Sequence, residues 1–278
     1  MAQGLQTLHI DVRAGVAVVT MVRERVRNAF NEAMIEELDS AFEELGTDAS
    51  VRAIVLAARG PVFCAGADLE WMARMANFTP EENRLDALRL ARMLRTISRC
   101  PKPTLARVHA DAYGGGVGLV ASCDMAFGAA DATFCLSETR LGLIPATIGP
   151  HVVRAIGFRA ALRYFQTAET FDSAEALRIG LLHGVAARDQ LDATISSVLD
   201  ALSLTSVHAT REAKRLVHDI SGKPLTDELL AETAERIASA RGSDDGREGV
   251  RAFLEKRKPR WQTRAPTPPS TIDDDEEM

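Results

Sequence analysis

The stretch DAYGGGVGLVASCDMAFGA, residues 111–129, decides the fold, because Gly114–Gly116 and Gly118 stand where a strand turns into an apolar helix. Glycine in a helix interior costs about 1 kcal/mol relative to alanine, so this crowding needs a physical reason. The first N–H groups of a helix have no partner within it and carry partial positive charge. Because glycine has no Cβ atom, a ligand oxygen can approach them closely. The pattern therefore predicts a site for an anion or a developing oxyanion.

Close packing of the helix against a strand is the alternative explanation of the glycine run. Two nucleotide-binding patterns are excluded. No Gly-Lys-Ser/Thr follows the glycines, as a P-loop requires, and their spacing differs from the G-x-G-x-x-G of a dinucleotide site.

A second loop of the same kind comes earlier in the chain. In GPVFCAGADLEWM, residues 60–72, glycine again joins a strand segment (VRAIVLAA, residues 51–58) to a helix. Gly66 would let the chain turn so that the N–H of Ala67 points outward. Two strand ends that each offer one N–H could hold a single oxygen atom from two sides. The pair of loops therefore indicates an oxyanion site more strongly than either loop alone.

A glutamate lies in a third segment, FCLSETRLGLIPATIGPHVV, residues 134–153. Glu138 follows the predicted strand ATFCL in an apolar neighbourhood, where an unpaired carboxylate is costly to bury. Desolvation should raise its pKa, which suits a general acid or base. A glutamate that faces solvent or caps the next turn is the alternative.

Strand and helix segments alternate over most of the chain, which predicts an α/β core. Residues around Ala14–Gly15 are typical of a hairpin turn, and Thr79 with Glu82 forms a capping-box signal for a long helix. The predicted parts are a core (1–203), a helical oligomerisation region (204–260) and a proline-rich, acidic, disordered tail (261–278).

Composition and charge narrow the function classes. The formal net charge is −6, and the tail residues Asp273–Glu277 supply five of the negative charges, so nothing indicates a nucleic-acid partner. No apolar run is long enough to span a membrane, and the N-terminus lacks a secretory signal, so we expect a cytoplasmic protein. The cysteines show no zinc-like spacing and are expected to be reduced thiols, with no metal bound. They are Cys64, Cys100, Cys123 and Cys135.

Taken together, these segments resemble the crotonase superfamily, the enoyl-CoA hydratase/isomerase family. The resemblance rests on RERVRNAFNEAM (23–34), FCAGADL (63–69), GGGVGLVASCDMAFGAADATF (114–134), SETRLGLIP (137–145) and AFLEKRKP (252–259). It implies a spiral of ββα turns with a helical C-terminal trimerisation region, assembled as a homotrimer or a dimer of trimers. It also implies an acyl-CoA thioester substrate and no cofactor, since coenzyme A is part of that substrate.

The resemblance implies roles for single residues. The N–H groups of Ala67 and Gly115 would hold the thioester oxygen, and Glu138 would be the catalytic glutamate. Residues expected to contact coenzyme A or the acyl group are Arg25, Ala65, Asp68, Leu69, Gly118, Phe253 and Lys256. A solvated basic face is the alternative explanation of Arg25 and Lys256.

Gly118 also marks a missing acid. Straight-chain hydratases of the family use two glutamates, and the first lies three residues after the oxyanion glycine, at the place of Gly118. Glycine there should open space beside the acyl chain and remove a charge that would repel a substrate carboxylate. The segments around Gly118 and Glu138 also resemble the methylglutaconyl-CoA and isohexenylglutaconyl-CoA hydratases. This second resemblance implies that the protein hydrates a branched or carboxylated 2-enoyl-CoA, such as the 3-methylglutaconyl-CoA of leucine degradation.

Two other functions stay open. A Δ3,Δ2-enoyl-CoA isomerase would use Glu138 as its single base, whereas a catalytically weak acyl-CoA-binding or RNA-binding homologue would need no base. Arg140, His151 and Arg154 lie nearest in the sequence as cations for a substrate carboxylate. A packing or capping role is the more ordinary explanation of His151, and a surface or intersubunit role that of Arg140.

Overall fold

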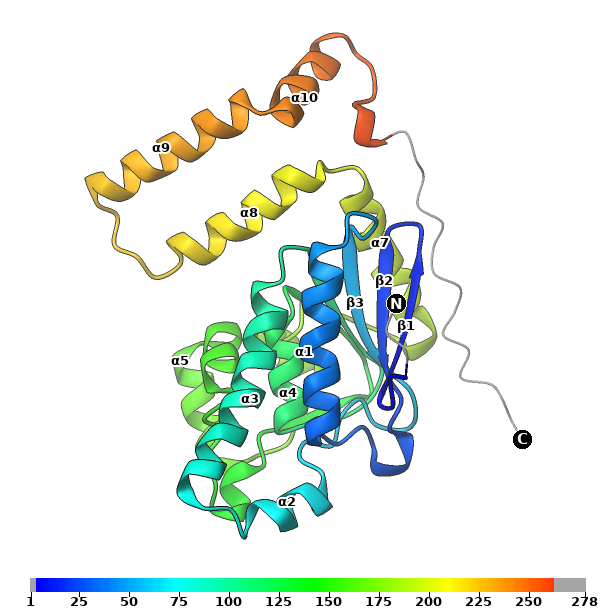
Figure 1. The fold of residues 1–278 in the computed structure, drawn as a ribbon, viewed down its shortest axis with the longest axis vertical. Coiled ribbons are helices and arrows are strands. Elements are labelled where there is room, and N and C mark those ends of the chain that lie inside the picture. Colours follow the sequence, from blue (N-terminus) through cyan, green and yellow to red (C-terminus); the bar gives the residue numbers. More distant parts are fainter. Residues whose placement is uncertain (1–3, 263–278) are drawn as a thin grey trace.

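A computed structural model describes residues 4–262, and its core is a β-sheet with helices on both faces (Figure 1). Six strands form the sheet in the order β1-β2-β3-β4-β6-β9. They are β1 (Leu8–Arg13), β2 (Val16–Met21), β3 (Ala53–Ala58), β4 (Thr104–Val108), β6 (Met125–Ala129) and β9 (Gly184–Ala186). Strands β1 and β2 pair antiparallel, and every other neighbouring pair is parallel. The predicted α/β core is confirmed.

The predicted hairpin is also confirmed. Ala14 and Gly15 have positive φ angles of 50° and 84°, as the favoured two-residue hairpin turn requires. The register places Leu8 opposite Met21. All residues of β2 and β3 are buried, which is typical of strands covered on both faces.

The helices cover the two faces of this sheet. They are α1 (Glu32–Thr47), α2 (Leu69–Met75), α3 (Pro80–Arg99), α4 (Gly115–Ser122), α5 (Gly149–Thr167), α6 (Ser173–Ile179) and α7 (Leu191–Ser203), with the short 3₁₀ helices η1 (Glu24–Val26), η2 (Glu138–Leu141) and η3 (Arg188–Gln190). Buried residues of α1, α3 and α4 pack on one face of the sheet, whereas Leu191, Ile195 and Leu199 of α7 pack on the other.

A second, smaller row of strands lies beside the carboxyl ends of the main sheet. It contains β5 (Ala112–Tyr113), β7 (Thr133–Cys135) and β8 (Phe171–Asp172). Isolated parallel bridges continue the row, from Phe30 to Ala67 and from Cys64 to Ala112. Each turn of the chain thus adds one strand to the main sheet and one short extended segment to the second row, as in a spiral of ββα turns. This second row fixes the loops that follow β3 and β4.

The C-terminal helices extend from one end of the core as an arm (Figure 1). They are α8 (Val207–Ile220), α9 (Asp227–Gly242) and α10 (Asp244–Leu254), followed by η4 (Arg260–Gln262). No residue of α8 or α9 is buried, and Ala252 is the one buried residue of α10. The boundary between a core and an oligomerisation region at residues 203 and 204 remains a prediction.

The prediction that residues 261 and 262 belong to a disordered tail was wrong. Trp261 and Gln262 belong to η4, and their side chains donate hydrogen bonds to the Leu204 carbonyl at 3.2 and 2.8 Å. These two hydrogen bonds attach the segment to Leu204. The proline-rich and acidic composition of residues 261–278 does not indicate such an attachment. The rest of the predicted tail, residues 263–278, lies outside the described residues.

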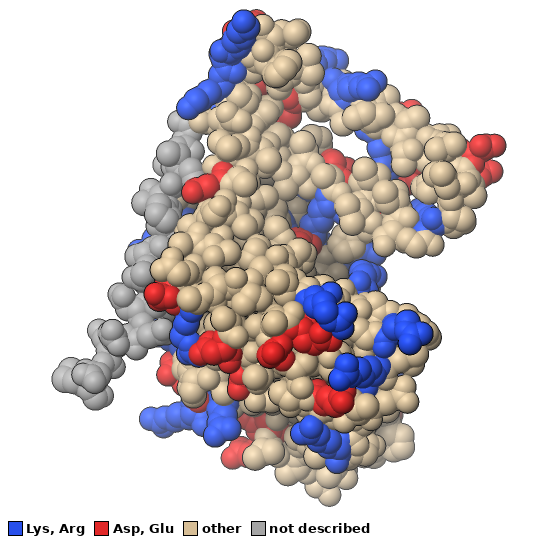
Figure 2. All heavy atoms as spheres, turned by 180° about the vertical axis from the view of Figure 1, so that it is seen from behind, with Lys and Arg blue, Asp and Glu red and all other residues tan. Residues whose placement is uncertain are grey.

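The surface carries charges of both signs. Figure 2 shows basic and acidic side chains next to each other on the lower part of one face, with a wide uncharged area above them. Over residues 4–262, no helix combines the length and the apolar character that a membrane span needs.

Candidate active site

Two loops meet at the carboxyl ends of neighbouring parallel strands. One runs from β3 to α2 and the other from β4 to α4. Ligands bind at such strand ends in open α/β sheets. A Cβ atom on Gly66 would lie 3.2 Å from the Tyr113 carbonyl oxygen, so the two loops are in contact. Gly66 also has a φ of 90°, a conformation that favours glycine.

The bridge between Phe30 and Ala67 turns one amide outward. The Phe30 N–H donates to the Gly66 carbonyl at 2.7 Å, and the Asp68 N–H donates to the Phe30 carbonyl at 2.8 Å. A parallel bridge of this kind uses the groups on either side of Ala67 and leaves its own N–H facing away. That N–H has no acceptor within residues 4–262. The structure thus keeps the first predicted amide available for a ligand.

The second amide is at the first position of α4. The preceding residue, Gly114, has φ 49° and ψ −115°, and no side chain caps the helix. The Gly114 N–H donates to the Cys135 carbonyl at 2.8 Å, but the Gly115 N–H has no acceptor in the described part of the chain. A Cβ atom on Gly115 would lie 2.7 Å from Cε2 of Phe30, so close packing also requires glycine here. Both explanations of the glycine run therefore apply at Gly115.

Glu138 lies beside this helix start. A Cβ atom on Gly114 would be 3.2 Å from its Oε1 atom. Its Oε2 atom is buried and accepts no hydrogen bond from the residues that the structure describes. Burial raises the pKa of Glu138, and its own backbone N–H is the one opposing influence. A desolvated carboxyl group beside the start of α4, where the Gly115 amide is free, is suited to accept a proton and to return it.

The space expected beside Gly118 is not there. A Cβ atom on Gly118 would overlap Cγ2 of Ile148 and would lie 2.8 Å from its Cβ. Ile148 precedes α5 and is 1% exposed, so this side chain fills the volume that glycine vacates. The prediction of open room was wrong because it considered α4 without the helix that crosses it. Nothing in the sequence near Gly118 indicates that Ile148 packs there.

Several predicted binding residues lie along the first loop. Ala65 donates its N–H to the Arg27 carbonyl at 3.0 Å, which places η1 and its exposed residue Arg25 beside the loop. Leu69 is 81% exposed. Asp68 is buried instead. It caps α2 and forms an ion pair with Arg23 at 3.0 Å.

Sequence reasoning missed the role of Arg23. Its guanidinium contacts Asp68 and the Ala29 carbonyl, and so ties the segment before α1 to the loop that presents Ala67. Asp68 was the available signal. An aspartate at a helix start tends to cap the helix, and a capping carboxylate that becomes buried needs a cationic partner such as Arg23.

Two predicted binding residues lie far from this site within one chain. Phe253 and Lys256 belong to the end of α10 and the turn after it, and Figure 1 shows α10 at the opposite end of the molecule from α2. Phe253 is 82% exposed. The structure of one chain therefore does not bring either residue to Glu138, and their contact with coenzyme A remains a prediction.

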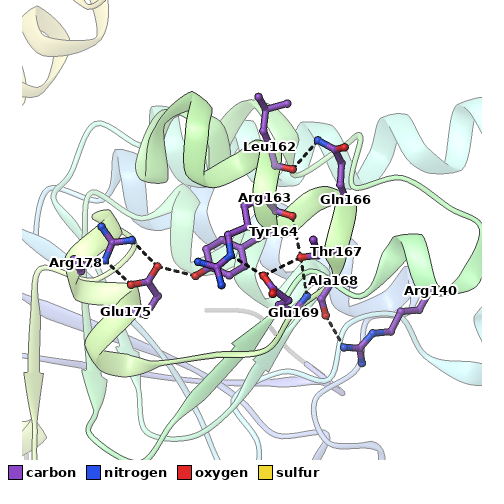
Figure 3. Close-up of polar contacts among 10 residues, drawn as sticks. All are labelled: Arg140, Leu162, Arg163, Tyr164, Gln166, Thr167, Ala168, Glu169, Glu175 and Arg178. Atoms are coloured by element: carbon purple, nitrogen blue, oxygen red, sulfur yellow. Dashed lines mark hydrogen bonds and ion pairs between the residues drawn. The ribbon is translucent and has the colours of Figure 1, made fainter.

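The predicted cations differ in what they contact. Arg140 donates from Nη2 to the Ala168 carbonyl at 2.6 Å (Figure 3). Burial, together with the charge of Arg154, lowers the pKa of His151, so this ring favours its neutral form. Arg154 itself is exposed. His151 is therefore a poor cation for a substrate carboxylate.

Comparisons with known proteins agree with this geometry. Residues 11–264 match the family described as enoyl-CoA hydratase/isomerase. A Legionella pneumophila crystal structure assigned as an enoyl-CoA hydratase/isomerase (crotonase) is 42% identical, with TM-score 0.87 over 93% of this chain and 100% of that chain. An enoyl-CoA hydratase structure from Shewanella pealeana is 40% identical, with TM-score 0.90 over 92% of this chain and 96% of that chain. A Thermus thermophilus protein assigned as an enoyl-CoA hydratase is 33% identical over 254 residues, which cover 91% of this chain and all of that protein. This chain therefore belongs to the enoyl-CoA hydratase/isomerase family.

Proposed function

We propose that this protein is a hydro-lyase that adds water to the double bond of a 2-enoyl-CoA. The observation that carries the proposal is the buried, unpartnered Oε2 of Glu138 beside the start of α4, where the Gly115 N–H is free. The thioester oxygen would accept hydrogen bonds from Ala67 and Gly115, which stabilise the enolate that forms during the reaction.

Glu138 would then serve both proton transfers in turn. As a carboxylate it takes a proton from water while the water oxygen bonds to C3, and the double-bond electrons move onto the thioester oxygen. The protonated glutamate then gives that proton to C2, and the thioester carbonyl is restored. The raised pKa of Glu138 supports the first of these steps, because it makes the carboxylate a stronger base toward the water molecule.

For the substrate we propose a branched or carboxylated 2-enoyl-CoA, such as 3-methylglutaconyl-CoA. The support is electrostatic. Gly118 stands at the position where straight-chain hydratases of the family carry a second glutamate, and a substrate carboxylate in a desolvated site would be repelled by a carboxylate there. Extra room is not part of this argument, because Ile148 fills the space beside Gly118.

The second candidate is a Δ3,Δ2-enoyl-CoA isomerase, and Ile148 is the observation that favours it. An aliphatic side chain next to Gly118 offers no hydrogen bond to a water molecule, whereas moving a proton between two carbons needs only one base. Ile148→Ala should therefore raise the ratio of hydration to isomerisation if water access is what limits addition.

Steady-state assays in oxygen-18-labelled water test both candidates. The substrates are crotonyl-CoA, 3-methylglutaconyl-CoA and a 3-enoyl-CoA, and mass spectrometry detects the label in the product. We expect label at C3 and a higher kcat/KM for 3-methylglutaconyl-CoA than for crotonyl-CoA. Good hydration of crotonyl-CoA without any of 3-methylglutaconyl-CoA would refute the proposed substrate. Conversion of the 3-enoyl-CoA to an unlabelled 2-enoyl-CoA would identify an isomerase.

We also propose a homotrimer or a dimer of trimers, in which α10 of one subunit reaches the site of the next. The exposed Phe253 and Leu254 and the unburied helices α8 and α9 support an assembly through the arm. Light scattering after size-exclusion chromatography measures the mass. A monomer that is fully active would contradict the proposal.

A further inference from the structure

One oxygen atom of the Glu138 carboxyl group, Oε2, is held by no hydrogen-bond partner in the described part of the chain. Only the backbone N–H of Glu138 itself opposes the effect of burial on its pKa. The position of the carboxyl group therefore depends on the position of η2, the short helix on which it stands.

The hydrogen bonds within η2 are local. The Arg140 N–H donates to Ser137, the Gly142 N–H to Thr139 and the Leu143 N–H to Glu138, at 3.1, 3.2 and 3.1 Å. These bonds shape the turn but do not attach it to the rest of the protein. On its N-terminal side, the attachment is the end of β7, where the Cys135 carbonyl accepts the Gly114 N–H at 2.8 Å.

On the C-terminal side, the attachment is Arg140. Although the residue is exposed, its Nη2 donates to the Ala168 carbonyl at 2.6 Å (Figure 3). Ala168 is the C-cap of α5, has a φ of 49° and is 1% exposed. Its carbonyl also accepts a hydrogen bond from the Cys135 thiol at 3.2 Å. A cation at this end of a helix is further favoured by the helix dipole.

The end of α5 is itself firmly held. Figure 3 shows Tyr164 donating to Glu175, which also binds Arg178. The Tyr164 hydroxyl lies 2.7 Å from Glu175 Oε1, and its ring centroid lies 4.4 Å from that of Phe171. The bonds from Arg178 and Tyr164 lower the pKa of Glu175 to about 2, as a strongly stabilised carboxylate should show. Ala168 therefore offers Arg140 a fixed acceptor.

We propose that Arg140 is a positioning residue for Glu138: by binding the Ala168 carbonyl it holds η2 so that the carboxyl group stays beside Gly114 and the free amide of Gly115. The inference rests on the proposed function, since it gives Glu138 the catalytic task. It assigns Arg140 to the scaffold of the site, instead of to a solvated surface or a substrate carboxylate.

The test compares Arg140→Met, which removes the donors, with Arg140→Lys, which keeps one cationic donor. Arg84→Met is the matched control, because Arg84 forms an exposed ion pair with Glu81 on α3. A displacement of about 1 Å in a reacting group can cost about 100-fold in rate, so we expect Arg140→Met to lower kcat by about 10- to 100-fold. KM should change little, Arg140→Lys should restore part of kcat, and Arg84→Met should match the wild type.

A carboxyl titration by carbon-13 NMR, assigned with Glu138→Gln, supplies a readout besides activity. In Arg140→Met the pKa of Glu138 should move down toward its ordinary value, because the displaced group regains water. A folded Arg140→Met with wild-type kcat and wild-type titration would overturn the proposal. So would an Arg140→Met that fails to fold, if Arg140→Lys folds with full loss of kcat and an unchanged titration. A wild type that turns over no enoyl-CoA would refute the proposed function alone, and the titration would still test Arg140.

Discussion

The helices α3 and α4 lie in the same layer of the molecule, and their N-termini are built in opposite ways. At α3, Thr79 accepts a hydrogen bond from the Glu82 N–H, and Glu82 Oε2 accepts from the Thr79 N–H at 2.7 Å. At α4, the residue before the helix is Gly114, which has no side chain to cap it, and the Gly115 N–H remains free.

The difference separates stability from function. A capped start satisfies the free N–H groups of a helix within the chain and stabilises it by about 1 kcal/mol. An uncapped start forgoes that stabilisation and keeps donors for a ligand. The two glutamates near these helix starts differ in the same way. The Glu82 carboxylate accepts a hydrogen bond from the N-cap of its own helix, whereas Glu138 Oε2 has no partner among the described residues. Substitutions at the two helix starts should accordingly affect different measurements.

The largest expected difference is between the two glutamates. Glu138→Gln keeps the size of the side chain but cannot exchange the proton, so we expect kcat to fall by about 100- to 10,000-fold. The matched change Glu82→Gln at α3 should leave kcat within about twofold of the wild type, since α3 carries no part of the proposed chemistry. Steady-state assays on the best substrate measure both, and an unaffected Glu138→Gln would remove the catalytic role from this residue.

The next effect concerns the free amide of α4. In Gly115→Ala the new Cβ would lie 2.7 Å from Cε2 of Phe30, so the helix start must shift. The N–H of residue 115 would then no longer point at the thioester oxygen. Loss of one oxyanion donor typically costs about 100-fold in kcat. Gly149→Ala on α5 is the control, because its Cβ would meet nothing closer than 3.7 Å. If the Gly115 and Gly149 variants have equal kcat, the amide at position 115 does not bind the thioester.

A pH effect should distinguish the carboxyl groups further. Burial raises the folded-state pKa of Glu138 above its ordinary value of 4.5, so the folded protein binds this proton more tightly than the unfolded chain. The free energy of unfolding therefore falls as the pH rises from that ordinary value through the raised one. Glu138→Gln removes this loss and should raise Tm at neutral pH, but not at pH values below the ordinary pKa. Calorimetry across that range checks it, and a variant less stable at neutral pH would contradict the stated cause.

The smallest effect belongs to the capped helix. Thr79→Ala removes the hydroxyl that accepts from Glu82, and we expect the free energy of unfolding to fall by about 1 kcal/mol. Thr79→Ser keeps the hydroxyl and should behave as the wild type. Denaturant titration measures the stability, while kcat/KM of the folded Thr79→Ala should not change. A clear loss of kcat/KM would mean that α3 contributes to the site.

Local patterns predicted the elements that local forces build. The turn at Ala14–Gly15, the capping box at Thr79 and the alternation of strands and helices are properties of neighbouring residues, and the structure confirms them. The two free amides were also predictable, because a strand that ends in glycine before a helix exposes its N–H groups whatever surrounds it. The assignment of Trp261 and Gln262 to a disordered tail was wrong because both side chains bind the carbonyl of Leu204, a residue 57 positions away from Trp261.

The sequence by itself thus determined the fold class, the two glycine loops and the single carboxylate that follows β7. Only the tertiary structure decided what stands around them. Ile148 fills the space beside Gly118, and Arg140 donates a hydrogen bond to the Ala168 carbonyl at the end of α5. The physical reason is that a backbone pattern is set within a few residues, whereas the neighbour of a side chain is set by which helices cross.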